Sequence, residues 1–376
     1  MSEKDHSHQG HHPSRRAVMK SAAGLLSAPL IGKVTPANSQ EKLKGSGSVV
    51  VYGYGGSATA GIRKTVFEPF TKETGITVVD VIADSAEPQV RAMNQAGRVD
   101  WDVAFVDPQN HPAMSQAGMF EPIDYSLWDA ESLDGVPKSN RLKDAVVAFR
   151  SVTVLAYDAR AFPNGGPKNW ADFWNIGDFP GRRGLAQNPR HVGFALSANG
   201  EPPAERWPLT DDKFDRALRK LDELRPHITK WWTAGGEPVQ LLLNGELQVT
   251  SCYDSRALNA IRQGVPIRIV WDGGNLVNTM WAVLKGGPNT ANAQKLIAFV
   301  NRARNAAGFT LGTMLPGPNV NLLEHLPSDL TPLLNISKEN ASKVVEQDSE
   351  WLAAKRPDGK TNLEHIQERW LAWLTK

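Results

Sequence analysis

Short apolar segments that read as strands alternate with helical segments along most of the chain. Residues 48–52, 76–82 and 103–106 are strand-like, and the stretches between them place apolar side chains on one helical face. No hairpin signal joins neighbouring strands, and such alternation is typical of a parallel sheet covered by helices. We therefore expect an α/β fold with mainly parallel strands.

A second series of the same kind follows the third strand. A longer strand-like run covers residues 147–157, and helical segments alternate with short strands after it. Another strand-like run covers residues 276–284, and an amphipathic helix is expected over residues 289–304. The chain is long enough to bury two separate cores, so we expect two α/β units.

The first 39 residues differ in composition from the rest. Arg15 and Arg16 precede a weakly apolar stretch, residues 22–31, and small residues follow it near position 37. This order predicts a removable export signal, and the paired arginines resemble the twin-arginine type. About 10 apolar residues are too few to cross a bilayer, which takes roughly 20. A basic tail and an uncleaved anchor are the alternatives; we expect residues 1–39 to be removed after export to the periplasm.

Removal of this segment changes the charge balance. The whole chain carries 42 Lys and Arg and 40 Asp and Glu. Five of these bases and two of these acids precede residue 40, which leaves 37 bases and 38 acids. A balance so close to neutral argues against nucleic acid or an anionic membrane as a partner. Because the chain has one cysteine, Cys252, we expect neither a disulfide nor a cysteine-rich metal site, and we expect no metal and no cofactor.

Five blocks of sequence, in order along residues 48–375, carry a family resemblance. They cover residues 67–78, 100–103, 169–182, 264–274 and 291–300, and the third begins Asn-Trp-Ala-Asp-Phe-Trp. The blocks resemble, in type and order, segments of bacterial extracellular solute-binding proteins of ABC transporters. The block at 264–274 is similar to the spermidine/putrescine-binding branch. Each block is short, so their shared order carries the resemblance.

The resemblance implies two lobes that are joined by crossing strands near 147–157 and 276–284 and close on a ligand like a hinge. Lobe 1 is expected to contain residues 48–150 and 283–376, and lobe 2 residues 151–282. The resemblance also implies a monomeric, non-catalytic component of an ABC importer, which carries a small solute to a permease in the inner membrane.

Open α/β sheets bind ligands in the loops beyond the carboxyl ends of their strands. Five such loops and the end of the first crossing strand supply the candidate ligand-binding residues. Several have a structural alternative: Ser57, Asp107 and Asp254 could cap helices, and an arginine could form an ordinary salt bridge. The candidates are Tyr54, Gly56, Ser57, Asp107, Gln109, Arg150, Arg190, His191, Tyr253, Asp254, Asn278 and Thr279.

Departures from the polyamine-binding pattern indicate the ligand class. That branch places acidic residues in the loop matching 187–191, and an aromatic residue and an aspartate near 275–279. This chain has Arg190 and His191 in the first loop and lacks both residue types in the second. Because a guanidinium suits a carboxylate or phosphonate, we expect a small anionic or zwitterionic solute, such as an organic acid, an amino-acid derivative, an opine-like conjugate or a phosphonate. A true polyamine binder is the alternative.

Three other functions are less well supported. An exported enzyme would need a catalytic pattern, and the sequence has no nucleophile elbow, paired metal-ligand spacing or phosphate loop. Ferric-ion binders of this broad fold typically use adjacent tyrosines, and the five tyrosines of this chain include no adjacent pair. A binding module that serves a receptor or sensor instead of a permease has no distinguishing feature in the sequence.

Overall fold

The computed structural model describes residues 41–83 and 85–376, so the predicted export signal lies outside the described residues. The strands are β1 (Ser48–Gly53), β2 (Thr77–Ile82), β3 (Val103–Val106), β4 (Val146–Asp158), β5 (Arg183–Ala186), β6 (Ile228–Trp232), β7 (Val249–Tyr253), β8 (Ile267–Val283) and β9 (Val345–Glu346). The helices are α2 (Gly56–Ile62), α3 (Glu68–Thr74), α4 (Ala86–Gln95), α5 (His111–Gln116), α6 (Ala130–Gly135), α7 (Trp170–Trp174), α8 (Gly193–Ala198), α9 (Asp211–Leu224), α10 (Glu237–Leu243), α11 (Asp254–Arg262), α12 (Thr290–Val300), α13 (Ala303–Thr313), α14 (Lys338–Ala341), α15 (Ser349–Ala353) and α16 (Asn362–Leu374).

One mixed sheet contains the described strands. Its order is β2-β1-β3-β8-β4-β7-β5-β6, and β9 pairs with β8. Strand β1 runs parallel to β2 and β3, and β5 runs parallel to β6 and β7. Each antiparallel pair of the described sheet involves β4 or β8. The predicted α/β class is confirmed, with two parallel sets joined by a pair of antiparallel strands.

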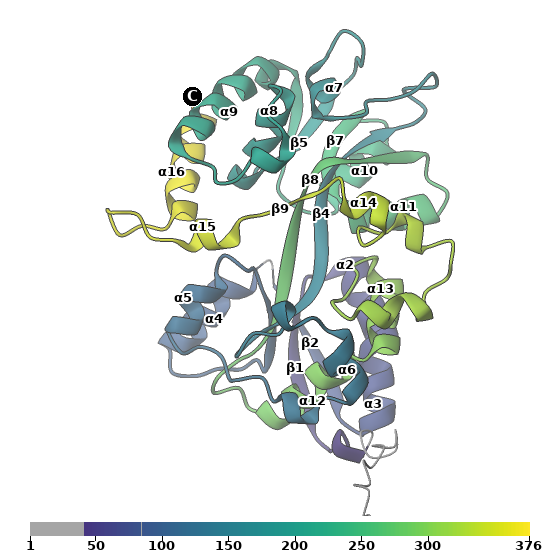
Figure 1. Ribbon diagram of the computed structural model, residues 1–376, viewed down its shortest axis with the longest axis vertical. Coiled ribbons are helices and arrows are strands. Elements are labelled where there is room, and N and C mark those ends of the chain that lie inside the picture. Colours follow the sequence, from purple (N-terminus) through teal and green to yellow (C-terminus); the bar gives the residue numbers. More distant parts are fainter. Residues whose placement is uncertain (1–40, 84) are drawn as a thin grey trace, which may run out of the picture. The chain divides into compact units, whose positions relative to one another are not determined.

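Strands β4 and β8 are the long members of the sheet, with 13 and 17 residues. They pair from Val146 opposite Trp281 to Asp158 opposite Ile267. Figure 1 shows them running between two groups of helices. Strand β8 is continuous from the short strand that the sequence indicates at 267–271 through the run at 276–284, because Gly273 and Gly274 lie inside the strand instead of ending it.

Separate apolar cores lie in the two groups. We call lobe 1 the part packed around Val51, Phe105 and Phe299, and lobe 2 the part packed around Phe194 and Phe214. A further lobe 2 cluster lies beneath α10 and α11, and a fourth joins α11 to α13 and the segment after it. Each lobe therefore packs its helices and its part of the sheet around apolar residues of its own.

Helices α2 and α13 approach each other closely in lobe 1. A Cβ atom added to Gly61 would lie 1.9 Å from the carbonyl oxygen of Gly312, and one added to Gly312 would lie 2.7 Å from that of Gly61. No side chain fits at either position, so the two glycines allow this contact between the helices. The contact lies in the last turn of α2 and holds that end of the helix against α13.

The C-terminal helices pack in lobe 2, which differs from the expectation that all of 283–376 belongs to lobe 1. Ile366, Trp370 and Trp373 of α16 belong to the same apolar cluster as Phe214 and Leu221 of α9. Figure 1 shows α16 beside α9. The spacing of four and three residues puts the three α16 side chains on one helix face, but spacing alone does not say which core covers that face.

Candidate functional site

Two polar contacts join the lobes near the ends of strands. Arg256 Nη1 of α11 donates to Ser57 Oγ at the start of α2, at 2.9 Å. Arg190 Nη1, in the loop after β5, donates to Asp107 Oδ2, in the loop after β3, at 3.3 Å. Four of the five predicted loops contribute to this region or border it; the fifth, residues 275–279, is not a loop, because it lies inside β8. We call the region the interlobe site.

Two tyrosines from different lobes lie among these charges. The Tyr54 ring stacks on Phe105 with centroids 5.3 Å apart, and the Tyr253 ring meets Trp232 edge to face at 5.6 Å. The pKa of the Tyr54 phenol is raised well above its usual value, first by desolvation among the surrounding groups and then by the charge of Asp107. This shift occurs although 41% of the residue surface is exposed. Burial also raises the pKa of Tyr253. Both phenols therefore stay neutral and present ring faces and hydroxyl groups.

The turn before α2 frees Ser57 for its contact with lobe 2. Gly56 has a φ of 60°, in the left-handed region that favours glycine. Thr59 Oγ1 accepts the N–H of Gly55, the residue before α2, at 2.8 Å, and no side chain caps the helix. The capping role considered for Ser57 is therefore not observed, and its hydroxyl accepts from Arg256 instead.

Two half-buried arginines, Arg150 and Arg256, form no salt bridge with a carboxylate of the described residues. Arg150 of β4 lies opposite Asn278 of β8, and Asn278 Nδ2 donates to Glu346 Oε1 at 2.6 Å. Burial lowers the pKa of Arg150, and the charges of Glu346 and Asp254 act against that shift. Its Nε atom is buried and has no hydrogen-bond partner in the described chain. Burial also lowers the pKa of Arg256, whose guanidinium donates to Ser57.

Residues 65–325 match the family model of the bacterial extracellular solute-binding proteins. The chain belongs to this family. It is 30% identical over 334 residues to the gamma-aminobutyric acid-binding protein of Pseudomonas aeruginosa PAO1, covering 88% of this chain and 92% of that protein. It is 24% identical over 268 residues to the spermidine/putrescine-binding periplasmic protein of Escherichia coli K12, covering 68% and 74%. The structure of the binding protein AgtB from Agrobacterium tumefaciens R10, in complex with agropinic acid, is 29% identical, with a TM-score of 0.75 and coverage of 88% and 99%.

Family membership settles the general role. The protein is the solute-binding component of an ABC importer, located in the periplasm or outside the cell, and the family is one of binding proteins rather than enzymes. In the described residues, no group of three or more His, Cys, Asp or Glu side chains is placed to hold a metal ion. No helix of that part of the chain is long and apolar enough to cross a membrane.

In this solute-binding protein, His191 supports the loop after β5 as a neutral side chain. Its Nε2 lies 3.2 Å from Thr153 Oγ1, and its ring stacks on Phe194 with centroids 5.3 Å apart. Burial, then the charges of Arg190 and Arg206, lowers the pKa of His191 to about 3. His191 therefore adds no positive charge for an anion near neutral pH, whereas the neighbouring Arg190 does.

This depressed pKa predicts an acid-sensitive contribution to stability. An unfolded histidine takes up a proton near pH 6.5, whereas the folded pKa is about 3, so stability is present above pH 6.5 and is lost as the pH falls. We expect the free energy of unfolding of the parent, relative to a His191→Gln variant, to decline below pH 6 by up to about 1.4 kcal/mol per pH unit. Urea unfolding of both proteins at pH 7, 6, 5 and 4.5 measures this difference. Equal pH slopes would rule out the neutral buried histidine.

Asp254 is a structural residue, contrary to its prediction as a ligand contact. It is fully buried, and its Oδ1 accepts the backbone N–H groups of Val152 at 3.1 Å and Ser255 at 2.8 Å. Its Oδ2 accepts from Asn335 Nδ2 at 2.8 Å. Burial raises its pKa to about 6 despite these bonds. The carboxylate thus ties α11 to β4 and to the segment before α14, and its burial keeps it from contact with a ligand in this structure.

The remaining predicted residues divide between buried and accessible positions. Gln109 is buried, and its Nε2 donates to Asp107 Oδ2 at 2.8 Å, so the Asp107 carboxylate bonds to side chains instead of capping α5. Thr279 is buried opposite Phe149 in the β4–β8 pair. Asn278, the residue before it, points to the other face, where Glu346 lies.

Four functional candidates were missed by the sequence argument. Glu87 Oε1 accepts the backbone N–H of Asp107 at 2.9 Å, and Arg256 contacts Ser57 across the lobes. Glu346 and Gln347 reach the site from β9 and the residue after it, and a strand of two residues leaves no pattern in the sequence. Arg256 is the one with a usable signal, because it follows the predicted loop at 252–255 on the first turn of a helix.

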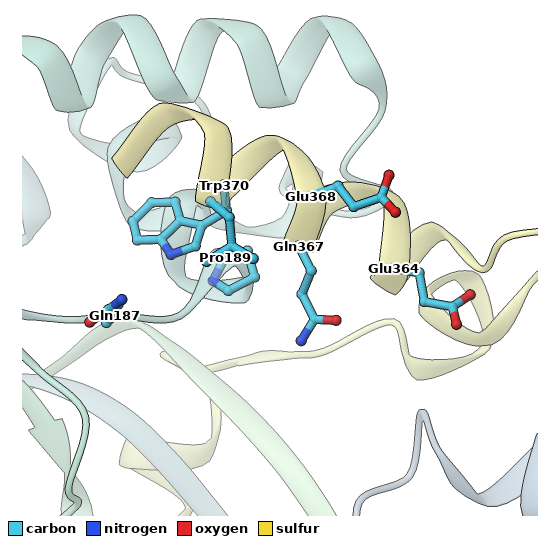
Figure 2. Close-up of a pocket in the computed structure, with 7 residues that line it drawn as sticks. Gln187, Pro189, Glu364, Gln367, Glu368 and Trp370 are labelled. Carbon is cyan, nitrogen blue, oxygen red and sulfur yellow. The ribbon is translucent and has the colours of Figure 1, made fainter. Parts of the chain in front are cut away.

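A separate surface pocket lies against α16. It has a volume of about 380 Å³, and Figure 2 shows its walls. The lining residues are Gln187, Pro189, Glu364, Gln367, Glu368, Trp370 and Leu371. The pocket borders the 187–191 loop from the side of α16 and includes none of the predicted ligand residues. We place the candidate site at the interlobe contacts because charged and aromatic groups from both lobes meet there.

Proposed function

We propose that this protein captures a small zwitterion, a carboxylate joined by a short chain to an ammonium group, between its lobes and delivers it to an ABC permease. The proposal rests on the guanidinium groups of Arg150 and Arg256, which lack an anionic partner among the described residues. Both guanidiniums are half-buried, and neither is paired with a carboxylate of the described chain. Desolvated cations need an anionic partner, and a ligand carboxylate would satisfy this need with charge-assisted hydrogen bonds.

Carboxylates and aromatic rings near the interlobe site favour a ligand that carries an ammonium group at its other end. Asp107, Glu87 and Glu346 carry the carboxylates near the interlobe site, and Tyr54 and Tyr253 supply ring faces. An ammonium is held by carboxylates and by aromatic faces. Similarity to a gamma-aminobutyric acid-binding protein and to a protein solved with agropinic acid also favours a ligand that contains a carboxylate.

A polyamine is the second candidate, favoured by the similarity to the spermidine/putrescine-binding protein. A diamine carries positive charge at both ends. Arg150 and Arg256 would repel one end unless each found an anion elsewhere. The arginines therefore weigh against this candidate, and they make the carboxylate the feature of the ligand to vary.

A thermal-shift screen tests the proposed ligand class. A ligand that binds only the folded state raises the melting temperature by mass action. Gamma-aminobutyric acid, butanoate, butylamine, putrescine and spermidine would each be added to the purified protein. We expect the zwitterion to give the largest increase and the diamine to give little. A large increase with spermidine or putrescine and none with compounds that contain a carboxylate would overturn the proposal.

We also propose that residues 1–39 direct export by the twin-arginine route and that the mature protein acts as a monomer whose lobes move about β4 and β8. The Arg15-Arg16 pair followed by an apolar stretch supports the route. Changing both arginines to lysine is expected to leave the precursor in the cytoplasm, as measured by immunoblotting of cell fractions. Unchanged periplasmic yield would exclude this route.

A further inference from the structure

Four side chains from three parts of the chain form a closed ring of hydrogen bonds. Gln109 Nε2 donates to Asp107 Oδ2 at 2.8 Å, and Gln347 Nε2 donates to Gln109 Oε1 at 3.0 Å. Arg190 Nη1 closes the ring, with Gln347 Oε1 at 3.4 Å and Asp107 Oδ2 at 3.3 Å. Lobe 1 supplies Asp107 and Gln109, lobe 2 supplies Arg190, and the segment after β9 supplies Gln347.

The chemistry of the end members fixes the direction of the ring. A guanidinium only donates and a carboxylate only accepts, so each amide between Arg190 and Asp107 has a single consistent orientation. Gln109 must turn its NH₂ group to Asp107 and its oxygen to Gln347. Gln347 must then turn its NH₂ group to Gln109 and its oxygen to Arg190. Each of the two positions needs a side chain that both donates and accepts. A side chain that could only donate or only accept would leave one neighbour without a hydrogen bond.

Burial makes the ring costly to break. Gln109 is 5% exposed and Gln347 is 4% exposed. An amide that loses its partner in such a place pays the full cost of desolvation. The backbone also holds Gln347 in place, because its N–H donates to the Leu276 carbonyl of β8 at 2.8 Å. Its Nε2 also lies 3.2 Å from Ser349 Oγ, and Arg190 Nε donates to Asn188 Oδ1 at 3.2 Å.

We propose that Gln347 is a positioning residue that holds Arg190 and Asp107 together and thereby stabilises the arrangement in which the two lobes touch. Gln347 is fixed to β8, one of the two strands that run through both lobes, and contacts one residue of each lobe. The C-terminal segment therefore connects the hinge strands to the interlobe site. The expected effect of Gln347 on ligand binding rests on the proposed function. The expected effect of Gln347 on the distance between the lobes does not.

The test measures that distance directly. Spin labels at Lys72→Cys in α3 of lobe 1 and Gln263→Cys after α11 of lobe 2 occupy exposed positions. The native Cys252 is fully buried, and burial raises the pKa of its thiol, so it should not react with the label. Distance distributions would be recorded for the labelled parent, Gln347→Ala, Gln109→Ala and the double variant, without ligand and with gamma-aminobutyric acid. Gln367→Ala, at an exposed amide of α16, is the matched control.

We expect Gln347→Ala to lower the ratio of short to long distances about 10-fold, with Gln367→Ala unchanged. The double variant should be no worse than the more affected single variant, because both residues belong to one network. If gamma-aminobutyric acid binds, its dissociation rate should rise about 10-fold in Gln347→Ala. Unchanged distances in Gln347→Ala, or additive effects in the double variant, would overturn the ring proposal. Failure of this ligand to bind any variant would count against the proposed function alone.

Discussion

Replacing Arg150 and Arg256 together by glutamine is expected to weaken the binding of gamma-aminobutyric acid by at least about 100-fold, because two charge-assisted hydrogen bonds to its carboxylate are lost at about 1.5–3 kcal/mol each. Glutamine retains a hydrogen-bond donor and much of the side-chain length, so the change removes mainly charge. Titration calorimetry on the parent, the two single variants and the double variant measures the effect.

The matched control is Arg304→Gln, the same chemical change at an exposed position of α13. It should leave the affinity within about twofold of the parent, because an exposed charge far from the ligand is screened by solvent. Melting temperatures of all variants show whether the fold is retained. If the double variant binds gamma-aminobutyric acid as tightly as the parent, the two arginines do not hold the carboxylate.

Trp370→Ala is expected to lower the free energy of unfolding by about 3–5 kcal/mol, the usual cost of truncating a large aromatic side chain in a core. Trp370 is 3% exposed, and its ring centroid lies 5.7 Å from that of Trp231 and 5.0 Å from that of Trp373. The three rings join α16 to β6, so the truncation leaves a cavity between the C-terminal helix and lobe 2. Guanidinium unfolding, followed by tryptophan fluorescence, measures the loss.

The next residue on the same helix gives the control. Leu371 is 56% exposed, so Leu371→Ala should change the free energy of unfolding by less than about 0.5 kcal/mol. A similar loss in both variants would mean that burial of the Trp370 ring is not what stabilises α16, because alanine raises helix propensity at both positions. A small loss in Trp370→Ala would show that the C-terminal helix is not part of the lobe 2 core.

The fold could be predicted where a periodic pattern coincides with a local element. The β-branched run at 76–82 became β2, and the run at 147–157 became β4 with one residue more at each end. The packing partner of α16 could not be predicted, because its apolar face fits either core. The continuity of β8 was missed because Gly273 and Gly274 usually indicate a break, whereas here a close approach of other groups to β8 leaves no room for larger side chains.

The candidate site could be predicted by position but not by burial. The rule that ligands bind beyond strand ends led to Tyr54, Asp107 and Arg190. Asp107 and Arg190 form a hydrogen bond between the lobes, and Tyr54 lies close enough to Asp107 for its charge to raise the pKa of the phenol. The same rule could not show that Asp254 and His191 are covered by protein, since burial depends on distant segments. Contacts such as that between Gln109 and Gln347 join residues that are 238 positions apart in the sequence, and no local pattern records them.

Calorimetric titration of the purified protein with gamma-aminobutyric acid and with putrescine distinguishes a carboxylate-binding site from a polyamine-binding site. The two molecules have chains of similar length, and they differ mainly in carrying a carboxylate or an ammonium at one end. We expect one-to-one binding of gamma-aminobutyric acid and, for putrescine, an affinity weaker by at least about 100-fold, because the charge of the arginines favours only the carboxylate. Tighter binding of putrescine, with no heat from gamma-aminobutyric acid, would show that the interlobe site binds a polyamine instead of a zwitterion.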